Sequence, residues 1–316
     1  MTRRLILWLK IVIAATLVGL MLHLVKPGAI WGALLSARLE LVLLGGLLMP
    51  VNLWLQEYKW RYLARLVKPA TTISETTGSL LGGMAFGIVT PGRLGEYGRA
   101  LFIRDTPPMK LVGLTVIDKF YNLGCTVAFG LPALVMLPAA LGIIAPRFFA
   151  PVLALVALID LLLLYLALDT RPVKSLIYAL QLMLPKGNQI AQLVGGLERF
   201  GAREARVTLL LTLAHYAVYL LQYHFIINGF CPLGLDISAR GAAAVLFTKS
   251  ALPISLGDLG LDQLVSVQFF GQFGAAPVAA FDASLVLFGF NVLLPALVGL
   301  LFIGRLQLGG KKEAAQ

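Results

Sequence analysis

The chain has 316 residues, of which 59% are hydrophobic and only 13% are charged, whereas roughly a quarter of the residues of a soluble domain are charged. This composition predicts an all-α polytopic membrane protein, a single membrane domain over 1–316 that leaves no room for a separate soluble enzyme domain. The net charge of +11 points to membrane topology and anionic lipid headgroups rather than to nucleic acid, because basic residues of membrane proteins mark the cytoplasmic side.

Apolar segments of membrane-spanning length occur six times along the chain. A transmembrane helix needs about 20 mostly apolar residues. The first segment follows Arg3 and Arg4 and is too long for the apolar part of a typical signal peptide, so we interpret it as a helix that stays in the membrane. The predicted spans are 5–25, 39–57, 111–138, 147–168, 207–229 and 278–303.

Two further apolar stretches, 77–104 and 241–273, are each interrupted by a Pro/Gly motif. Their leading arms, from Thr77 to Val89 and from Gly241 to Leu256, are short for a full crossing. Irregular backbone at membrane depth persists only where protein or a water-filled cavity covers it. We therefore predict six transmembrane helices plus two re-entrant, broken-helix hairpins.

The distribution of Lys and Arg gives an orientation for this arrangement. With both termini in the cytoplasm, most of the 26 basic residues, including Lys59, fall in cytoplasmic segments of an inner-membrane protein. The basic connector 169–206 contains the stretch VKSLIYALQLMLP, which fits an amphipathic helix on the inner leaflet or an ordinary helix packed on the bundle. Only four basic residues fall in external segments in this arrangement: Lys26, Arg38, Arg147 and Arg240.

The two interrupted stretches match each other. Pro-x-x-Leu-Gly-acid-x-Gly begins at Pro91 and again at Pro253, and the flanking spans also superpose at this offset. The pattern predicts a first repeat over 39–138 and a second over 207–303, in opposite orientations. Inverted repeats with broken helices are typical of secondary transporters, whose substrate site lies between the repeats; the alternative is that the motifs are only kinks left by a gene duplication. The predicted break residues are Pro91, Gly92, Gly95, Gly98, Pro253, Gly257 and Gly260.

The stretch TPGRLGEYGRALFIRD resembles the Pro-Gly-x-x-Gly-Glu-x-x-Arg signature of the lysylphosphatidylglycerol synthase transmembrane (flippase-like) family. The Glu-Arg-x-x-Asp element that commonly follows in that family is matched only partly here, by the stretch from Asp118 to Asn122. The family's later Gly-x-Gly-x-x-Glu element resembles the stretch from Gly257 to Gln263, with Gln263 in place of the usual Glu and an extra acid at Asp258. The resemblance implies lipid translocation, or support of it, rather than lipid synthesis, because the aminoacyl-transferring domain of some relatives is absent.

Ionisable residues within apolar segments are costly and mark candidate sites. Arg93 and Arg99 can hold a phosphate with their planar donors, and the half-helix that restarts after the break would point free N–H groups at the same anion. Glu96 either belongs to the site or forms a local ion pair with Arg99. Adjacent helical residues do not face each other, so Asp118 and Lys119 should have separate partners. The candidate substrate-binding residues are Arg93, Glu96, Arg99, Asp118, Lys119, Asn122, Asp258 and Asp262.

Other polar residues carry weaker signals. His215 and His224 are either satisfied core residues or members of a proton relay, Asp160 has no evident partner, and Asp258 could bind a cation or proton or serve as an N-cap. Cys125 and Cys231 fit buried thiols. No metal-ligand spacing, nucleotide-binding loop or hydrolytic triad is present, so no metal, cofactor or catalytic residue is expected.

These patterns favour a flippase-like transporter that moves, or assists the movement of, an anionic phosphate-headgroup lipid or lipid-linked precursor. The first alternative is a lipid-modifying membrane enzyme with Glu96 or Asp118 as general base, although no convergent nucleophile–base set is found. The second is a non-transporting scaffold of a lipid-synthesis complex. Anionic lipids are the expected partners, a lipid-synthesising or glycosyl-transferring enzyme is a candidate partner, and the oligomeric state stays open.

Overall fold

The computed structural model describes residues 27–140, 145–169, 188–252 and 258–306, together with the single residues 8, 12, 16, 171 and 175. Within these ranges every regular element is a helix and no strand occurs, so the predicted all-α class is confirmed. The long helices are α3 (Leu39–Ala64), α5 (Pro108–Ala140), α6 (Pro146–Leu168), α9 (Ala202–Phe230) and the continuous run of α12 (Pro277–Phe288), the π-helical η2 (Gly289–Leu293) and α13 (Leu294–Leu300). The short helices are α2 (Pro27–Ser36), α4 (Ile73–Gly87), η1 (Leu94–Phe102), α8 (Asn188–Gly195), α10 (Leu235–Ala251), α11 (Leu261–Gly271) and η3 (Ile303–Arg305).

Five of the described helices are long and apolar enough to cross a membrane. They occupy 39–64, 108–136, 147–168, 202–230 and 277–300 and correspond to five predicted spans. The remaining predicted span, 5–25, lies almost wholly outside the described residues, as does the stretch VKSLIYALQLMLP of the connector.

Two boundaries differ from the sequence prediction. Helix α3 continues to Ala64 instead of ending at residue 57, so Lys59 lies inside the helix and not in a cytoplasmic segment. Helix α9 begins at Ala202, inside the predicted connector. A span predicted from hydropathy ends where charged residues accumulate, whereas a helix continues wherever its charged side chains find partners in the bundle.

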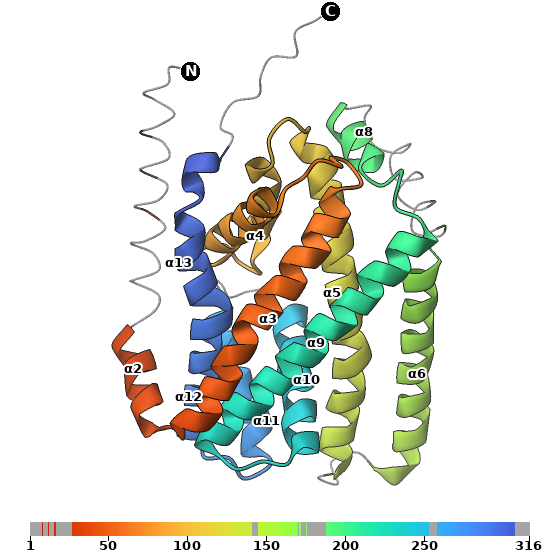
Figure 1. The fold of residues 1–316 in the computed structure, drawn as a ribbon. Helices are drawn as coiled ribbons and strands as arrows, with labels where there is room; N and C mark the ends of the chain where they lie inside the picture. The colour runs from red at the N-terminus through yellow and green to blue at the C-terminus, as the bar shows by residue number, and fades with distance from the viewer. Residues whose placement is uncertain are drawn as a thin grey trace, which may run out of the picture.

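Each interrupted stretch contains two short helices, α4 and η1 in the first hairpin and α10 and α11 in the second (Figure 1). Their interpretation as re-entrant hairpins stays a prediction. Helix α4 and the 3₁₀ helix η1 lie at the end where α3 finishes, while α10 and α11 lie at the opposite end. In the first hairpin Gly92 and Arg93 adopt left-handed φ values of 55° and 57°, which end one helix and redirect the chain into the next. Residues 253–257, which include the predicted breaks Pro253 and Gly257, lie outside the described residues; Gly260 has φ 85°.

The first hairpin begins four residues earlier than the predicted residue 77, because its helix has a strong N-terminal cap. Thr72 accepts a hydrogen bond from the backbone N–H of Glu75 at 3.3 Å, and the Glu75 carboxylate accepts from the Thr72 N–H at 3.1 Å. This reciprocal capping box satisfies two helix-terminal donors, so α4 starts at Ile73.

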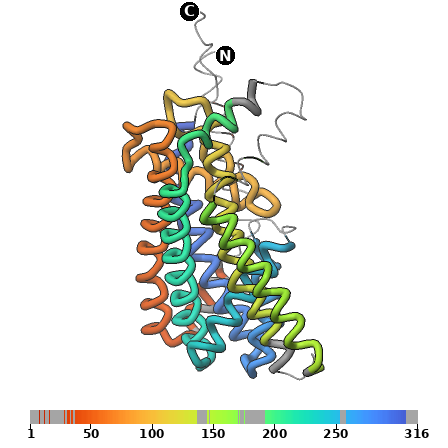
Figure 2. Tube along the Cα trace, turned by 90° about the vertical axis from the view of Figure 1, so that its right-hand side faces the viewer, coloured from red at the N-terminus to blue at the C-terminus, as the bar shows by residue number. Residues whose placement is uncertain are grey.

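Corresponding long helices of the two halves run in opposite directions. In Figure 1, α3 ascends and α9 descends, and α5 descends while α12 and α13 ascend. Helices α3 and α9 pack along each other, and they lie side by side when the molecule is turned by 90° (Figure 2). The order long helix, hairpin, long helix therefore occurs twice, and the interpretation of the two sets as an inverted repeat stays a prediction.

Separate hydrophobic clusters hold the two hairpins against the long helices. The cluster around the first hairpin includes Trp60, Leu111 and Leu114, all fully buried. The cluster around the second includes Tyr223 and Phe270, also fully buried. Within a bilayer, such clusters stabilise helix contacts by close packing of side chains, so each hairpin has its own apolar support.

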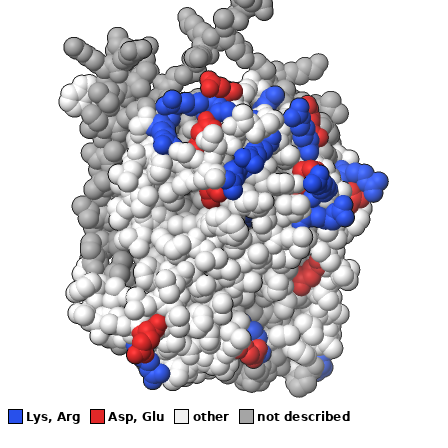
Figure 3. Space-filling view, viewed as in Figure 1, with Lys and Arg blue, Asp and Glu red and all other residues white. Residues whose placement is uncertain are grey.

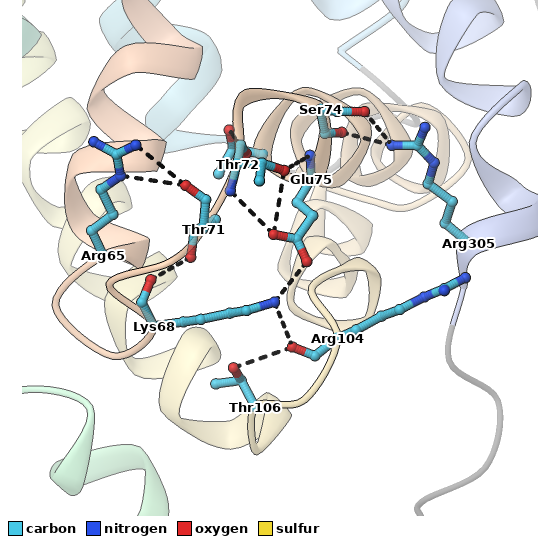
Figure 4. Close-up of polar contacts among 10 residues, drawn as sticks. Arg65, Lys68, Thr71, Thr72, Ser74, Glu75, Arg104, Thr106 and Arg305 are labelled. Carbon is cyan, nitrogen blue, oxygen red and sulfur yellow. Dashed lines mark hydrogen bonds and ion pairs between the residues drawn. The ribbon is translucent and has the colours of Figure 1, made fainter.

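Charged side chains gather at the end of the molecule where α3 finishes and α9 begins, above a broad uncharged band (Figure 3). We call this the basic end; its residues include Arg61, Arg65, Lys68, Arg104 and Arg305. A close-up shows how its loops are joined: Lys68 binds Glu75 at 2.6 Å and the Arg104 carbonyl at 3.1 Å, and Arg305 donates to the Ser74 carbonyl at 2.7 Å (Figure 4). The assignment of this end to the cytoplasm stays a prediction from the positive-inside rule.

Candidate functional site

A cavity of about 440 Å³ lies where the two hairpins approach α3, α5 and α9. The first hairpin contributes Arg93 and Glu96, and the second contributes Lys249 and Asp258. Its lining is mainly polar on the helices that face the hairpins: Asn52 and Gln56 of α3, Lys119, Asn122 and Thr126 of α5, Thr212, His215, Tyr216 and Tyr219 of α9, and Asn291 of η2.

Glu96 lies between two cations at the first hairpin. Its Oε1 is 2.5 Å from an Arg93 guanidinium nitrogen, and its Oε2 pairs with Lys119 of α5. The Arg93 Nε is buried and has no hydrogen-bond partner among the described residues. One donor of this guanidinium is therefore unused beside the cavity.

Asp118 forms a second ionic cluster behind the cavity wall. Its carboxylate binds Lys59 at 2.8 Å and Arg99 at 2.9 Å, and all three side chains are almost completely buried. The Arg99 guanidinium also lies over the Trp60 ring at 3.8 Å and donates to Thr115. Removing any one of these charges would leave a buried partner uncompensated, which is strongly destabilising.

Lys59 links this buried cluster to the cavity lining. Its ammonium donates to Asn122 Oδ1 at 2.6 Å and to Thr212 Oγ1 at 3.2 Å, and both acceptors line the cavity. The sequence pattern counted Lys59 as a cytoplasmic residue and missed this role. A lysine one turn before the end of an apolar helix was the available signal.

The second hairpin has the opposite charge arrangement. Lys249 of α10 lies 3.3 Å from Asp262 and 3.9 Å from Asp258. Asp258 adopts a left-handed φ of 69° at the start of the turn into α11. From this position Asp258 lines the cavity wall.

The structure separates the predicted site residues into two sets. Those that line the cavity are Arg93, Glu96, Lys119, Asn122 and Asp258, and those that support it from behind are Arg99, Asp118 and Asp262. Their roles in substrate binding stay predictions. As expected for adjacent residues, Asp118 and Lys119 have different partners.

Two expectations about the first hairpin are wrong. The alternative of a local Glu96–Arg99 ion pair does not hold, because the Arg99 guanidinium binds Asp118 and lies over the Trp60 ring. The restarted helix offers no free amides either, since the backbone N–H groups of residues 93–96 donate to acceptors on Thr90, Pro91 and Arg93 at 2.7–3.2 Å. At the first hairpin, side chains and not the helix N-terminus are therefore the available anion donors.

His215, His224 and Asp160 occupy three different surroundings. His215 lines the cavity, whereas His224 is bonded to Ser238 at 2.7 Å, outside it. Asp160 borders an apolar crevice between α5, α6 and α9, and its Oδ1 has no hydrogen-bond partner among the described residues. The described residues contain no group of three or more His, Cys, Asp or Glu that could hold a metal ion.

The ionisable side chains on the cavity wall carry a positive excess. Arg93, Lys119 and Lys249 face Glu96 and Asp258, so three bases oppose two acids. Two of the bases lie at the first hairpin, where Glu96 is shared between them. The wall nearest the first hairpin therefore favours an anion.

Comparison with known proteins agrees with the resemblance of the short motifs. The family model described as "Lysylphosphatidylglycerol synthase TM region" matches residues 7–299. No curated protein and no solved structure matches the chain.

Proposed function

The chain belongs to the lysylphosphatidylglycerol synthase TM region family, and from this premise we propose that it moves, or assists the movement of, an anionic phosphate-bearing lipid or lipid-linked precursor across the inner membrane. Membership of the family relates the protein to membrane lipid metabolism or transport. The direction of the basic end toward the cytoplasm is part of the proposal.

One observation carries the proposal: an Arg93 donor without a partner lies in a cavity between two broken hairpins, beside a second cation. Arg93 and Lys119 share the single carboxylate of Glu96, and the buried Arg93 Nε is unpaired among the described residues. A phosphate offers several acceptor oxygens and binds a guanidinium through two parallel hydrogen bonds. The phosphate would therefore complete the hydrogen bonding of Arg93 without displacing Glu96 entirely.

The two carboxylates that could act as general bases, Glu96 and Asp118, are both engaged in ion pairs, and this favours transport over catalysis. Glu96 contacts two cations, and Asp118 contacts Lys59 and Arg99. Neither carboxylate is therefore free to contact a substrate hydroxyl. A lipid-modifying enzyme at this cavity would need another base, and His215 is the candidate that lines it.

The test measures flipping of a fluorescent anionic phospholipid in proteoliposomes, with a zwitterionic phospholipid of the same chains as the control lipid. Arg93→Gln should lower the anionic rate about 10- to 100-fold, as expected for loss of a hydrogen bond to a charged group. Arg93→Lys should recover only part of it, because an ammonium lacks the planar donor pair.

The control variant is Arg206→Gln, which removes the same charge from an exposed residue whose side chain bonds only the Ala202 carbonyl among the described contacts. Its rates should equal those of the unchanged protein. Equal rates for both lipids that do not respond to Arg93→Gln would contradict the transporter and favour the scaffold. Accumulation of a modified lipid with purified protein would favour the enzyme.

A further inference from the structure

Four side-chain amides from three helical elements meet at one wall of the cavity. Asn52 donates to Gln222 Oε1 at 3.3 Å and to Asn291 Oδ1 at 3.4 Å. Gln56 donates to Asn52 Oδ1 at 2.9 Å, and Asn291 donates to Gln222 Oε1 at 3.0 Å. We call Asn52, Gln56, Gln222 and Asn291 the amide cluster.

The amide cluster lies deep within apolar helices, where neutral amides are costly unless they are bonded. Asn52 and Gln222 are at most 1% exposed. Amides often join transmembrane helices, but a purely structural cluster has no reason to face a polar cavity. Asn52, Gln56 and Asn291 line the same cavity as Arg93 and Lys119.

Hydrogen-bonding capacity remains unused around the amide cluster. Within the described part of the chain, the buried Gln222 Nε2 and the buried Tyr216 hydroxyl have no hydrogen-bond partner. Tyr216 lines the cavity, and its ring is stacked on Phe129 with centroids 5.0 Å apart. Buried polar atoms without partners are rare in native structures and require an explanation such as a ligand.

The backbone at Asn291 supports a ligand role. Asn291 lies in η2, a five-residue π-helix between α12 and α13. A π-turn inside a longer helix is an uncommon feature that often occurs at functional sites, because it redirects a side chain without ending the helix. Here it carries the one amide of the third element to the cavity wall.

We propose that the amide cluster and Tyr216 bind the hydroxyl groups of a polyhydroxylated headgroup, such as a glycerol or a sugar, on the lipid whose phosphate is held by Arg93 and Lys119. An amide presents a donor and an acceptor side by side and so matches adjacent hydroxyls. Neutral amides and a phenol suit uncharged hydroxyls, while the cations occupy the phosphate end. This inference rests on the proposed function and names its substrate class.

The experiment compares phosphatidylglycerol, phosphatidylinositol and phosphatidylpropanol with the same chains. Each carries one phosphodiester charge, but only the first two carry headgroup hydroxyls. The rate in proteoliposomes and the thermal stabilisation in mixed micelles should both favour a hydroxylated lipid over phosphatidylpropanol. The preference should be about tenfold, which corresponds to two neutral hydrogen bonds. A higher rate with phosphatidylglycerol would indicate a site for a glycerol headgroup, and a higher rate with phosphatidylinositol would indicate a site for a cyclic, sugar-like headgroup.

Two variants separate recognition from structural support. Tyr216→Phe keeps the stacked ring and removes only the hydroxyl, so it should lower the rates of the two hydroxylated lipids more than the phosphatidylpropanol rate and thereby reduce the preference. Asn291→Leu should abolish the preference. The matched control is Gln268→Leu, an exposed amide of α11 outside the cavity, which should keep the preference of the unchanged protein.

The outcomes distinguish the inference from the proposed function. Equal rates and equal stabilisation for all three lipids in the unchanged protein would overturn the hydroxyl site and leave anionic transport standing. Tyr216→Phe that lowers all rates in proportion would likewise assign the amide cluster to structure alone. Absence of transport, with stabilisation still stronger for a hydroxylated lipid, would overturn the transporter and retain the site.

Discussion

The two hairpins carry the same sequence motif but opposite arrangements of charge. In the first, the acid Glu96 lies between the cations Arg93 and Lys119. In the second, the cation Lys249 lies near the acids Asp258 and Asp262. The aligned acids, Glu96 and Asp258, therefore have partners from unrelated positions in the two halves.

This difference indicates that the repeated sequence encodes the chain break, whereas the charge balance is specific to each half. An anion entering the cavity meets an excess of cations only at the first hairpin. At the second hairpin, Lys249 and Asp258 balance each other on the cavity wall. The two ends of one cavity thus differ in charge, although their sequence motifs match.

The largest effect should come from removing the acid behind the first hairpin. Asp118→Asn leaves Lys59 and Arg99 buried without a counter-ion, and breaking a buried pair typically costs about 3–5 kcal/mol. Arg99 cannot relieve this by losing its proton. We expect a sharp loss of folded protein, measured by size-exclusion chromatography and by the thermal unfolding midpoint in detergent.

The double variant Asp118→Asn with Lys59→Met is the control for this interpretation. It removes one of the two unpaired cations with little change in volume, so part of the lost stability should return. A double variant as unstable as Asp118→Asn alone would mean that shape, not charge, makes Asp118 necessary.

A smaller loss is expected from closing the space at the first break. An added Cβ at Gly95 would overlap the backbone carbonyl of Phe86, which cannot turn aside as a side chain can. Gly95→Ala should cost about 1–3 kcal/mol and lower the unfolding midpoint. Gly271→Ala in the second hairpin is the matched control, because a Cβ there meets nothing within 4 Å. Equal midpoints for the two variants would show that the break is not tightly packed.

Much of this arrangement could be predicted from the sequence because its signals are local. Length and apolarity locate the five described spans, and Pro91 with Gly92 marks the first break. Ionisable residues within apolar segments stand out individually, so Glu96 and Lys119 could be selected without a structure. The family that the short motifs resemble is the one whose model matches residues 7–299.

The pairing of these residues could not be predicted, because it depends on contacts between distant helices. Glu96 and Arg99 are close in sequence, yet Arg99 binds Asp118, 19 residues away. Lys59 was assigned to a loop since hydropathy decreases before the helix ends. The amide cluster was missed because neutral amides barely change hydropathy, and the π-turn at Asn291 has no recognised sequence signature.

A still smaller loss is expected from removing the cation of the second hairpin. Lys249→Met leaves Asp258 and Asp262 without the ammonium that lies 3.9 Å and 3.3 Å from them. The variant should lower the unfolding midpoint less than Asp118→Asn does, because Asp258 borders the cavity instead of being enclosed by the bundle. A midpoint equal to that of the unchanged protein would contradict the proposed role of Lys249 as the counter-ion of both acids.

The smallest effect concerns the entrances of the two hairpins. Burial alone would raise the pKa of Glu75, but the hydrogen bonds from Lys68 and Thr72 outweigh it, so the pKa falls below its ordinary value of 4.5. A lowered carboxyl pKa stabilises the fold above the ordinary value, and this stabilisation is lost as the pH falls through the lowered value. Glu75→Gln retains the cap geometry and removes only the ion pair with Lys68, so it should cost about 0.2–1 kcal/mol at pH 7. The difference from the unchanged protein should vanish in acid. At the second entrance, Asp236 pairs with Arg240 while largely exposed, so Asp236→Asn should change the unfolding midpoint less than Glu75→Gln does. A larger effect from Asp236→Asn would reverse the comparison and make the second entrance the more firmly held one.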